Sequence, residues 1–218
     1  MKQSFAMQSV TIAAGKVRLA GDLGLPEKPM GIVLFAHGSG SGRMSPRNRF
    51  VARTLMDGGL ATLLLDLLEE RESEDRRKVF DIDLLADRLM AAADWLARNP
   101  STEGLRLGYF GASTGAGAAL QAAARAPAMV GAVVSRGGRP DLAAPFLPDV
   151  LAPTLLIVGG EDGPVIRMNE EALALLTCPK KLVIVPGATH LFEEPGTLEQ
   201  VASLVLQWFR RHLGRIDD

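Results

Sequence analysis

The hydrophobic residues of this chain fall into short continuous runs that alternate with longer amphipathic segments. A run of about five apolar residues without polar alternation is typical of a strand whose two faces are both buried, as in a parallel sheet covered by helices. Such runs predict parallel strands at residues 32–36, 61–65, 105–110, 130–134, 154–158 and 182–185.

The remaining segments show two other periodicities. Residues 10–12 and 17–19 alternate at period two, which predicts an antiparallel hairpin at the edge of the sheet. Apolar stripes at helical spacing run through residues 82–96 and 201–208. About eight strands with crossover helices predict a doubly wound, mostly parallel α/β sheet with helices on both faces. Because neither a linker nor a repeat interrupts this pattern, we expect residues 1–218 to form a single domain.

Composition narrows the function classes. Apolar residues make up 47% of the chain and the net charge is −1, so there is no electrostatic basis for binding nucleic acid or an anionic membrane. The first eight residues lack the apolar core of a signal peptide and no run is long enough to span a bilayer, so a cytoplasmic protein is expected. The single cysteine, Cys178, has no C-x-x-C partner, and three scattered histidines without an H-E-x-x-H motif predict no metal site.

The sequence Gly-Ala-Ser-Thr-Gly at residues 111–115 directly follows an apolar run and has the G-x-S-x-G form of a nucleophile elbow. In such an elbow a strand turns sharply into a helix and holds the serine in strained backbone geometry, so its neighbours must be small. A plain glycine-rich connection is the structural alternative. The motif predicts Ser113 as a nucleophile and places free N–H groups of the helix start beside it.

The base and its orienting acid follow by elimination. His37 ends a strand and His212 lies in a C-terminal helix, whereas His190 lies on a loop after the run 182–185, where open α/β sheets keep their sites. Where the nucleophile lies on such an elbow, the orienting acid lies between the serine and the histidine along the chain. Asp162 lies between Ser113 and His190, at the end of another strand. Glu161 is adjacent, but only one of the two side chains can face His190.

The glycine-rich turn at residues 38–42 matches neither a dinucleotide fingerprint nor a P-loop. It is better interpreted as half of an oxyanion hole, in which the backbone N–H of Ser39, with Gly40 as a further donor, joins that of Thr114. Gly38 and Gly40 are therefore also candidates for contact with substrate. Arg43, which follows the turn, is either a pocket residue or a charge flanking a helix.

Two further segments are candidates for substrate contact. Arg136 and Arg139 surround a Gly-Gly turn and would clamp a substrate carboxylate, or they pair with local acids as scaffold. The charged run at residues 69–78 has nearly balanced signs, so we expect a solvated loop or helix face that borders the pocket. The short segment 142–150 leaves no room for a helical cap.

With these motifs the chain resembles an α/β-hydrolase, and more closely the dienelactone-hydrolase-like group of small esterases without a cap domain. The resemblance rests on residues 37–42, 111–115, 159–162 and 186–190 and covers nearly the whole chain. Dienelactone hydrolases proper have a cysteine nucleophile where this chain has Ser113, so dienelactone itself is not the expected substrate. Similar sequences also form the C-terminal half of longer proteins that begin with a phosphoribosyltransferase domain, and we expect no such domain here.

The combined prediction is a cofactor-independent serine esterase that cleaves small esters or lactones through an acyl-enzyme on Ser113, with His190 as base and Asp162 as its orienting acid. The missing cap favours short acyl groups, and an arginine facing the pocket would add a preference for esters that bear a carboxylate. An acyltransferase or perhydrolase with the same triad is the alternative enzyme. A non-catalytic binding module on this fold is the alternative of another class.

Overall fold

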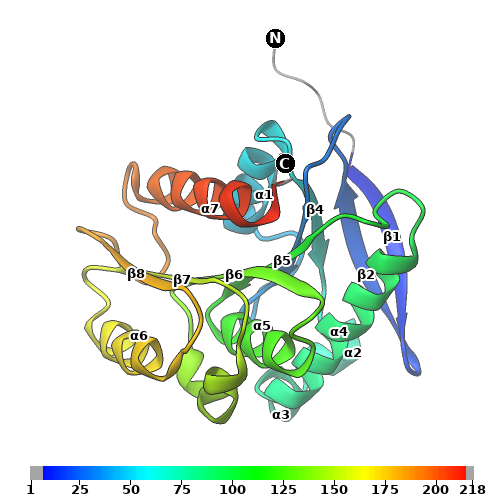
Figure 1. Ribbon diagram of the computed structural model, residues 1–218. Coiled ribbons are helices and arrows are strands. Elements are labelled where there is room, and N and C mark those ends of the chain that lie inside the picture. Colours follow the sequence, from blue (N-terminus) through cyan, green and yellow to red (C-terminus); the bar gives the residue numbers. More distant parts are fainter. Residues whose placement is uncertain (1–6, 215–218) are drawn as a thin grey trace.

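The computed structural model describes residues 7–214 of the chain. Its strands are β1 (Met7–Ala14), β2 (Val17–Gly24), β3 (Ile32–Ala36), β4 (Ala61–Leu65), β5 (Leu107–Ala112), β6 (Val130–Arg136), β7 (Thr154–Gly159) and β8 (Lys180–Val185). They form one sheet in the order β1-β2-β4-β3-β5-β6-β7-β8 (Figure 1). The β1–β2 and β2–β4 pairs are antiparallel and the other pairs are parallel. The predicted edge hairpin and mostly parallel sheet are therefore confirmed.

Helices cover both faces of this sheet, as predicted (Figure 1). One face carries α1 (Pro46–Asp57) and α7 (Thr197–Leu213), which pack against each other. The opposite face carries α4 (Ile82–Arg98), α5 (Thr114–Arg125) and α6 (Gly163–Leu175). The short helices α2 (Glu70–Ser73) and α3 (Arg76–Val79) lie between β4 and α4.

Strand β3 explains why the central strands read as unbroken apolar runs. Its residues Ile32, Leu34 and Ala36 pack on the α4–α5 face of the sheet, whereas Val33 and Phe35 pack on the α1–α7 face. All five are at most 1% exposed. A strand buried on both faces needs no polar position, because every side chain contributes to one of the two cores.

Strand β8 departs from this prediction. Of its six residues only Val185 is buried, and Ile184 is 37% exposed. The strand lies at the end of the sheet and pairs with β7 alone, so solvent reaches it from the unpaired side. The expectation of burial on both faces was wrong here because an apolar run does not distinguish a central strand from an edge strand.

Strand β5 begins two residues later than predicted and ends two residues later. The Leu105 N–H closes a turn on the Thr102 carbonyl at 3.1 Å, which keeps this residue out of the strand. At the other end Gly111 and Ala112 still pair with neighbouring strands. The ladder therefore carries the backbone directly into Ser113.

The charged segment after β4 is helical, in α2 and α3, and largely exposed, which confirms the predicted solvated helix face for most of its residues. Glu72 is the exception, because its carboxylate is buried and lies 3.3 Å from the Arg88 guanidinium and 3.0 Å from the Lys78 ammonium. The expectation of solvation was wrong for this residue, since its partner Arg88 comes from the distant helix α4.

No cap domain covers the carboxyl ends of the strands in the part of the chain that the structure describes. The connection after β6 contains only the 3₁₀ segment η1 (Pro140–Asp149), which packs on α5 and α6. Within residues 7–214 no helix combines the length and the apolar character needed to cross a membrane.

Candidate active site

Ser113 lies between β5 and α5 with φ 51° and ψ −124°, a strained conformation for a residue with a side chain. Glycine is required at both ends of the motif. A Cβ on Gly111 would lie 2.4 Å from the Ala116 Cα, and one on Gly115 would lie 2.3 Å from the Ala36 carbonyl oxygen. The strand, the turn and the helix therefore fit together only as a sharp elbow, which is the geometry that the G-x-S-x-G motif predicts.

Asp162 follows strand β7 and His190 follows strand β8, and the two side chains lie together. The Asp162 Oδ2 is 2.6 Å from the His190 Nδ1, within hydrogen-bond distance. Asp162 precedes α6, and His190 lies in a turn closed by the Phe192 N–H on the Thr189 carbonyl at 3.2 Å. Glu161 is directed elsewhere and its backbone N–H binds the Ala188 carbonyl. The structure thus brings Asp162, and not Glu161, to the imidazole.

The loop after β6 joins the elbow to this pair. The Ser113 N–H donates to the Arg136 carbonyl at 3.3 Å, and the Arg139 N–H donates to the Ser113 carbonyl at 3.0 Å. Between these residues Gly137 packs against the imidazole, since a Cβ there would lie 3.5 Å from the His190 Nδ1 and Cε1. Among residues 7–214 the Ser113 Oγ forms no hydrogen bond.

The glycine-rich turn approaches the elbow closely. A Cβ on Gly38 would lie 2.9 Å from the Ser113 Cβ, so only glycine fits there. The Ser39 N–H donates to the Thr114 Oγ1 at 2.9 Å. The two predicted oxyanion residues are therefore adjacent, but they are linked through a side-chain hydroxyl that sequence reasoning did not consider. Gly40 adopts a left-handed φ of 69° and completes the turn.

His37 has a structural role, consistent with its exclusion as the base. Its Nδ1 donates to the Gly38 carbonyl at 2.9 Å, and its Nε2 accepts the Leu67 N–H at 3.0 Å. Burial lowers the pKa of His37, which favours the neutral ring that this pair of hydrogen bonds requires. The side chain ties the oxyanion turn to the end of β4.

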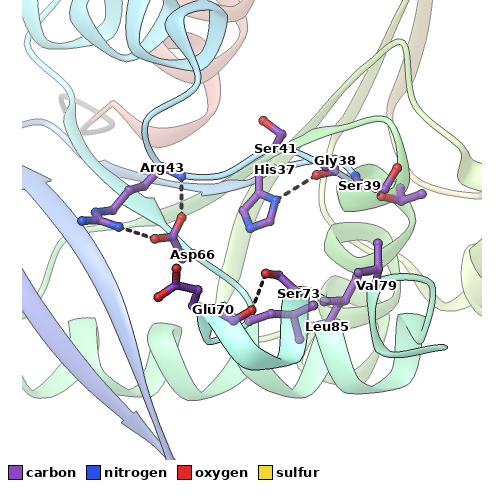
Figure 2. Close-up of a pocket in the computed structure, with 13 residues that line it drawn as sticks. His37, Gly38, Ser39, Ser41, Arg43, Asp66, Glu70, Ser73, Val79 and Leu85 are labelled. Atoms are coloured by element: carbon purple, nitrogen blue, oxygen red, sulfur yellow. Dashed lines mark hydrogen bonds and ion pairs between the residues drawn. The ribbon is translucent and has the colours of Figure 1, made fainter. Parts of the chain in front are cut away.

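A cavity of about 490 Å³ opens beside the turn (Figure 2). Gly38, Ser39, Gly40 and Thr114 line it on the side of the elbow, whereas Ser113, Asp162 and His190 are not among its lining residues. The opposite side comes partly from the charged segment, through Glu70 and Ser73, and from Val79, which directly follows it. The prediction that this segment borders the pocket is confirmed. The position of the charged segment directly after β4 was the observation that predicted this, because sites in such sheets lie where the strands end.

Arg43 lines the same cavity, but its charge is already neutralised. Its backbone N–H donates to the Asp66 Oδ1 at 2.6 Å, its guanidinium pairs with Asp66, and its Nε lies 3.7 Å from the Asp22 Oδ2. In Figure 2 the Glu70 side chain extends toward Asp66. Among residues 7–214 the Glu70 carboxylate has no ion-pair partner, so it leaves one uncompensated negative charge in the wall.

Neither of the other candidate arginines lines this cavity. Arg139 binds Asp141 through two parallel contacts of 2.8 and 2.7 Å, a scaffold pairing. Arg136 is only 7% exposed, and its guanidinium lies over the rings of Phe110 and Phe192, with the Cζ 6.0 Å from each ring centroid. Within the described chain no three His, Cys, Asp or Glu side chains are grouped to hold a metal ion, and Cys178 is buried.

Comparison with known proteins adds an independent line of support. Residues 20–213 match the model of a family described as the dienelactone hydrolase family. The crystal structure of a dienelactone hydrolase from Anabaena variabilis ATCC 29413 shares 59% identity with this chain at a TM-score of 0.94, over 97% of this chain and 100% of that chain.

Two other relatives define the limits of the likeness. XC6422 from Xanthomonas campestris, described as an α/β serine hydrolase without lid, shares the fold at 23% identity and a TM-score of 0.77 over 95% of each chain. A putative phosphoribosyl transferase of Mycobacterium tuberculosis (strain ATCC 25618 / H37Rv) is 60% identical over 206 residues, which cover 94% of this chain and 46% of that protein. The chain thus spans about half the length of this relative.

Proposed function

The chain belongs to the dienelactone hydrolase family and is a hydrolase with the α/β-hydrolase fold, and we propose that it cleaves small carboxylic esters or lactones through an acyl-enzyme on Ser113. The observation that carries this proposal is that one loop, residues 136–139, binds the strained elbow of Ser113 and packs against His190, which is hydrogen-bonded to Asp162. A serine raised on such a turn, with an oriented imidazole nearby, is the arrangement needed to activate a weak hydroxyl nucleophile.

In the proposed mechanism the Ser113 Oγ attacks the ester carbonyl while the His190 Nε2 accepts its proton. The Asp162 carboxylate holds the Nδ1–H and stabilises the imidazolium that forms. The proton then passes to the departing alkoxide, which leaves as an alcohol and gives the acyl-enzyme. Water attacks that ester by the same route and releases a carboxylic acid and the free serine.

The developing oxyanion would be bound at the start of α5. The Thr114 N–H is one of the first N–H groups of this helix, which are free of helical hydrogen bonds and favour negative charge. The Ser39 N–H is close by, and in the resting site it donates to the Thr114 hydroxyl. Because that hydroxyl accepts one hydrogen bond, its own hydrogen remains free to point toward the oxyanion, so Thr114 would contribute two donors.

The cavity favours small, uncharged esters as substrates. Its volume of about 490 Å³ suits a small molecule, and no cap extends it into a long apolar groove. Arg43 is paired with acids, whereas Glu70 leaves a net negative charge in the wall. A carboxylate-bearing ester would be repelled on this side, and neither Arg136 nor Arg139 reaches the cavity to compensate.

A fluorophosphonate probe tests the proposal directly. It should label the native protein at one serine, and Ser113→Ala should lose both the label and ester turnover, whereas Ser101→Ala, an exposed control, should keep both. Ester hydrolysis by Ser113→Ala at the wild-type rate would refute the mechanism. Running the reaction with a competing alcohol distinguishes hydrolysis from acyl transfer, because only a transferase accumulates the new ester.

A further inference from the structure

Arg136 carries a buried positive charge without a counter-charge. The residue is 7% exposed, and within residues 7–214 its Nε and Nη1 make no hydrogen bond and its guanidinium makes no ion pair. Burial, and to a lesser extent the nearby Arg47, lowers the pKa of Arg136 to about 10, so the group is still charged at neutral pH. An apolar side chain of similar length would fill this position without a desolvation cost. Packing alone therefore does not account for an arginine.

The partners of this guanidinium are two aromatic rings, one from the strand that leads into the elbow and one from the histidine turn. Its Cζ lies 6.0 Å from the ring centroid of Phe110 and 6.0 Å from that of Phe192. Phe110 precedes Ser113 in β5, and Phe192 follows His190 in the histidine turn. A planar cation over two ring faces gains cation–π attraction, which is strongest where water is excluded.

Backbone strain points to the same residue. Within the described chain only two residues other than glycine have a positive φ: Ser113 at 51° and Phe192 at 54°. Arg136 contacts both, since its carbonyl accepts the Ser113 N–H at 3.3 Å and its guanidinium lies over the Phe192 ring. Strained residues persist only where their surroundings fix them in place. Because Phe192 closes the turn that carries His190, fixing its ring also fixes the imidazole.

We propose that Arg136 is a positioning residue that couples the nucleophile elbow to the histidine turn, because its guanidinium holds both Phe110 and Phe192 and so keeps His190 in reach of Ser113. The inference rests on the proposed esterase function. Arg136 acts through Phe192 and contacts no substrate. It is retained although its buried charge opposes folding, so its removal should slow turnover without loosening the fold.

The test replaces the charge while keeping the length of the side chain. Arg136→Met should lower kcat by about 10- to 100-fold through misplacement of the imidazole, with little change in KM. Its Tm should be unchanged or higher, because a buried unpaired charge is gone. Arg136→Lys keeps the charge but not the planar guanidinium, so its kcat should lie between that of the wild type and that of Arg136→Met. Should the Met variant not accumulate, the Lys variant supports the same comparison.

Arg47→Met is the matched control. Arg47 pairs with Glu193, next to Phe192, but its side chain is 31% exposed, so its loss should change kcat by no more than about twofold. Proton NMR gives a second readout. The proton between the His190 Nδ1 and Asp162 should give a low-field resonance that moves or broadens in Arg136→Met and stays in Arg47→Met.

Three outcomes would overturn the positioning role: an unchanged kcat in Arg136→Met, a kcat that falls only in step with a lower Tm, or an unchanged low-field resonance. Labelling of native Ser113 by a fluorophosphonate keeps this test separate from that of the esterase function. If the native protein reacts and only the Arg136 prediction fails, the proposed function stands. If the native protein does not react, both fail.

Discussion

The nucleophile elbow and the cavity wall opposite it are held in place by different means. In the elbow, Gly111 and Gly115 touch backbone atoms so closely that no side chain fits. The wall contains the ion pair of Arg43 with Asp66 and the Glu70 carboxylate, which has no ion-pair partner among residues 7–214. If the proposed function holds, the backbone fixes the geometry of the chemistry, whereas the choice of substrate depends on side chains that can be exchanged without disturbing the fold.

The largest effect is expected where the backbone presents the reacting groups. His190→Ala removes the base and should lower kcat by a factor on the order of 10⁶, as loss of a triad member does in serine proteases. Asp162→Asn leaves the imidazole in the wrong tautomer and should lower kcat by about 10⁴. Steady-state ester hydrolysis checks both. Loss of less than tenfold in either variant would place the chemistry elsewhere in the molecule.

The second-largest effect is expected from adding a methyl group to the backbone of the elbow. Gly115→Ala places a Cβ 2.3 Å from the Ala36 carbonyl oxygen, so a backbone segment must shift. We expect the free energy of unfolding to fall by about 1–3 kcal/mol and kcat to fall by about 100-fold. Gly163→Ala is the control, because its Cβ would meet nothing within 4 Å. Denaturant titration and kinetics measure the two effects, and similar behaviour of the two variants would contradict the comparison.

The same contrast separates what the sequence could predict from what it could not. The positions of the strands, the mostly parallel sheet and the elbow follow from local patterns, since apolar runs mark strands and the G-x-S-x-G motif marks the turn. Asp162 and His190 are 28 residues apart, and their pairing could be predicted because both follow strands whose carboxyl ends lie at one edge of the sheet.

Side-chain contacts between distant segments were not predictable in this way. The burial of Glu72 depends on Arg88, and the link between Ser39 and Thr114 spans 75 residues. From the sequence, Arg136 was a candidate for substrate binding because it and Arg139 surround a Gly-Gly turn. The two phenylalanines that surround it can be assigned only from the fold.

A moderate effect on the pH dependence of stability is expected from His37, which lies at the glycine-rich turn between the elbow and the cavity wall. Because burial lowers the pKa of His37 below its ordinary value of 6.5, the unfolded chain binds more protons than the folded one as pH falls through that value. Stability should therefore be constant at alkaline pH and decrease below about pH 6.5, until the folded ring is protonated as well. Each kcal/mol lost corresponds to roughly 2–4 °C in Tm for a chain of this size.

His37→Asn should remove this part of the acid sensitivity, measured as the difference in Tm between about pH 8 and about pH 5. His212→Asn is the comparison variant, because burial and the neighbouring Arg211 and Arg106 also lower the pKa of His212, which lies in α7 and not at the oxyanion turn. We expect its effect to be smaller, because its ring does not bind two backbone groups as that of His37 does. An equal or larger effect of His212→Asn would show that the ring beside the oxyanion turn is not the main source of acid sensitivity.

The smallest effect is expected in the cavity wall, where one charge changes and no backbone moves. Glu70→Gln removes the unpaired carboxylate, so the ratio of kcat/KM for a hemisuccinate ester to that for a butyrate ester should rise by about 2- to 5-fold. Glu74→Gln alters the same charged segment outside the cavity and should leave the ratio unchanged. High salt should reduce the difference in this ratio between the wild type and Glu70→Gln, because an exposed charge is screened over about 10 Å at 0.1 M ionic strength. A ratio that stays constant in Glu70→Gln, or rises equally in both variants, would mean that the wall does not select substrates by charge.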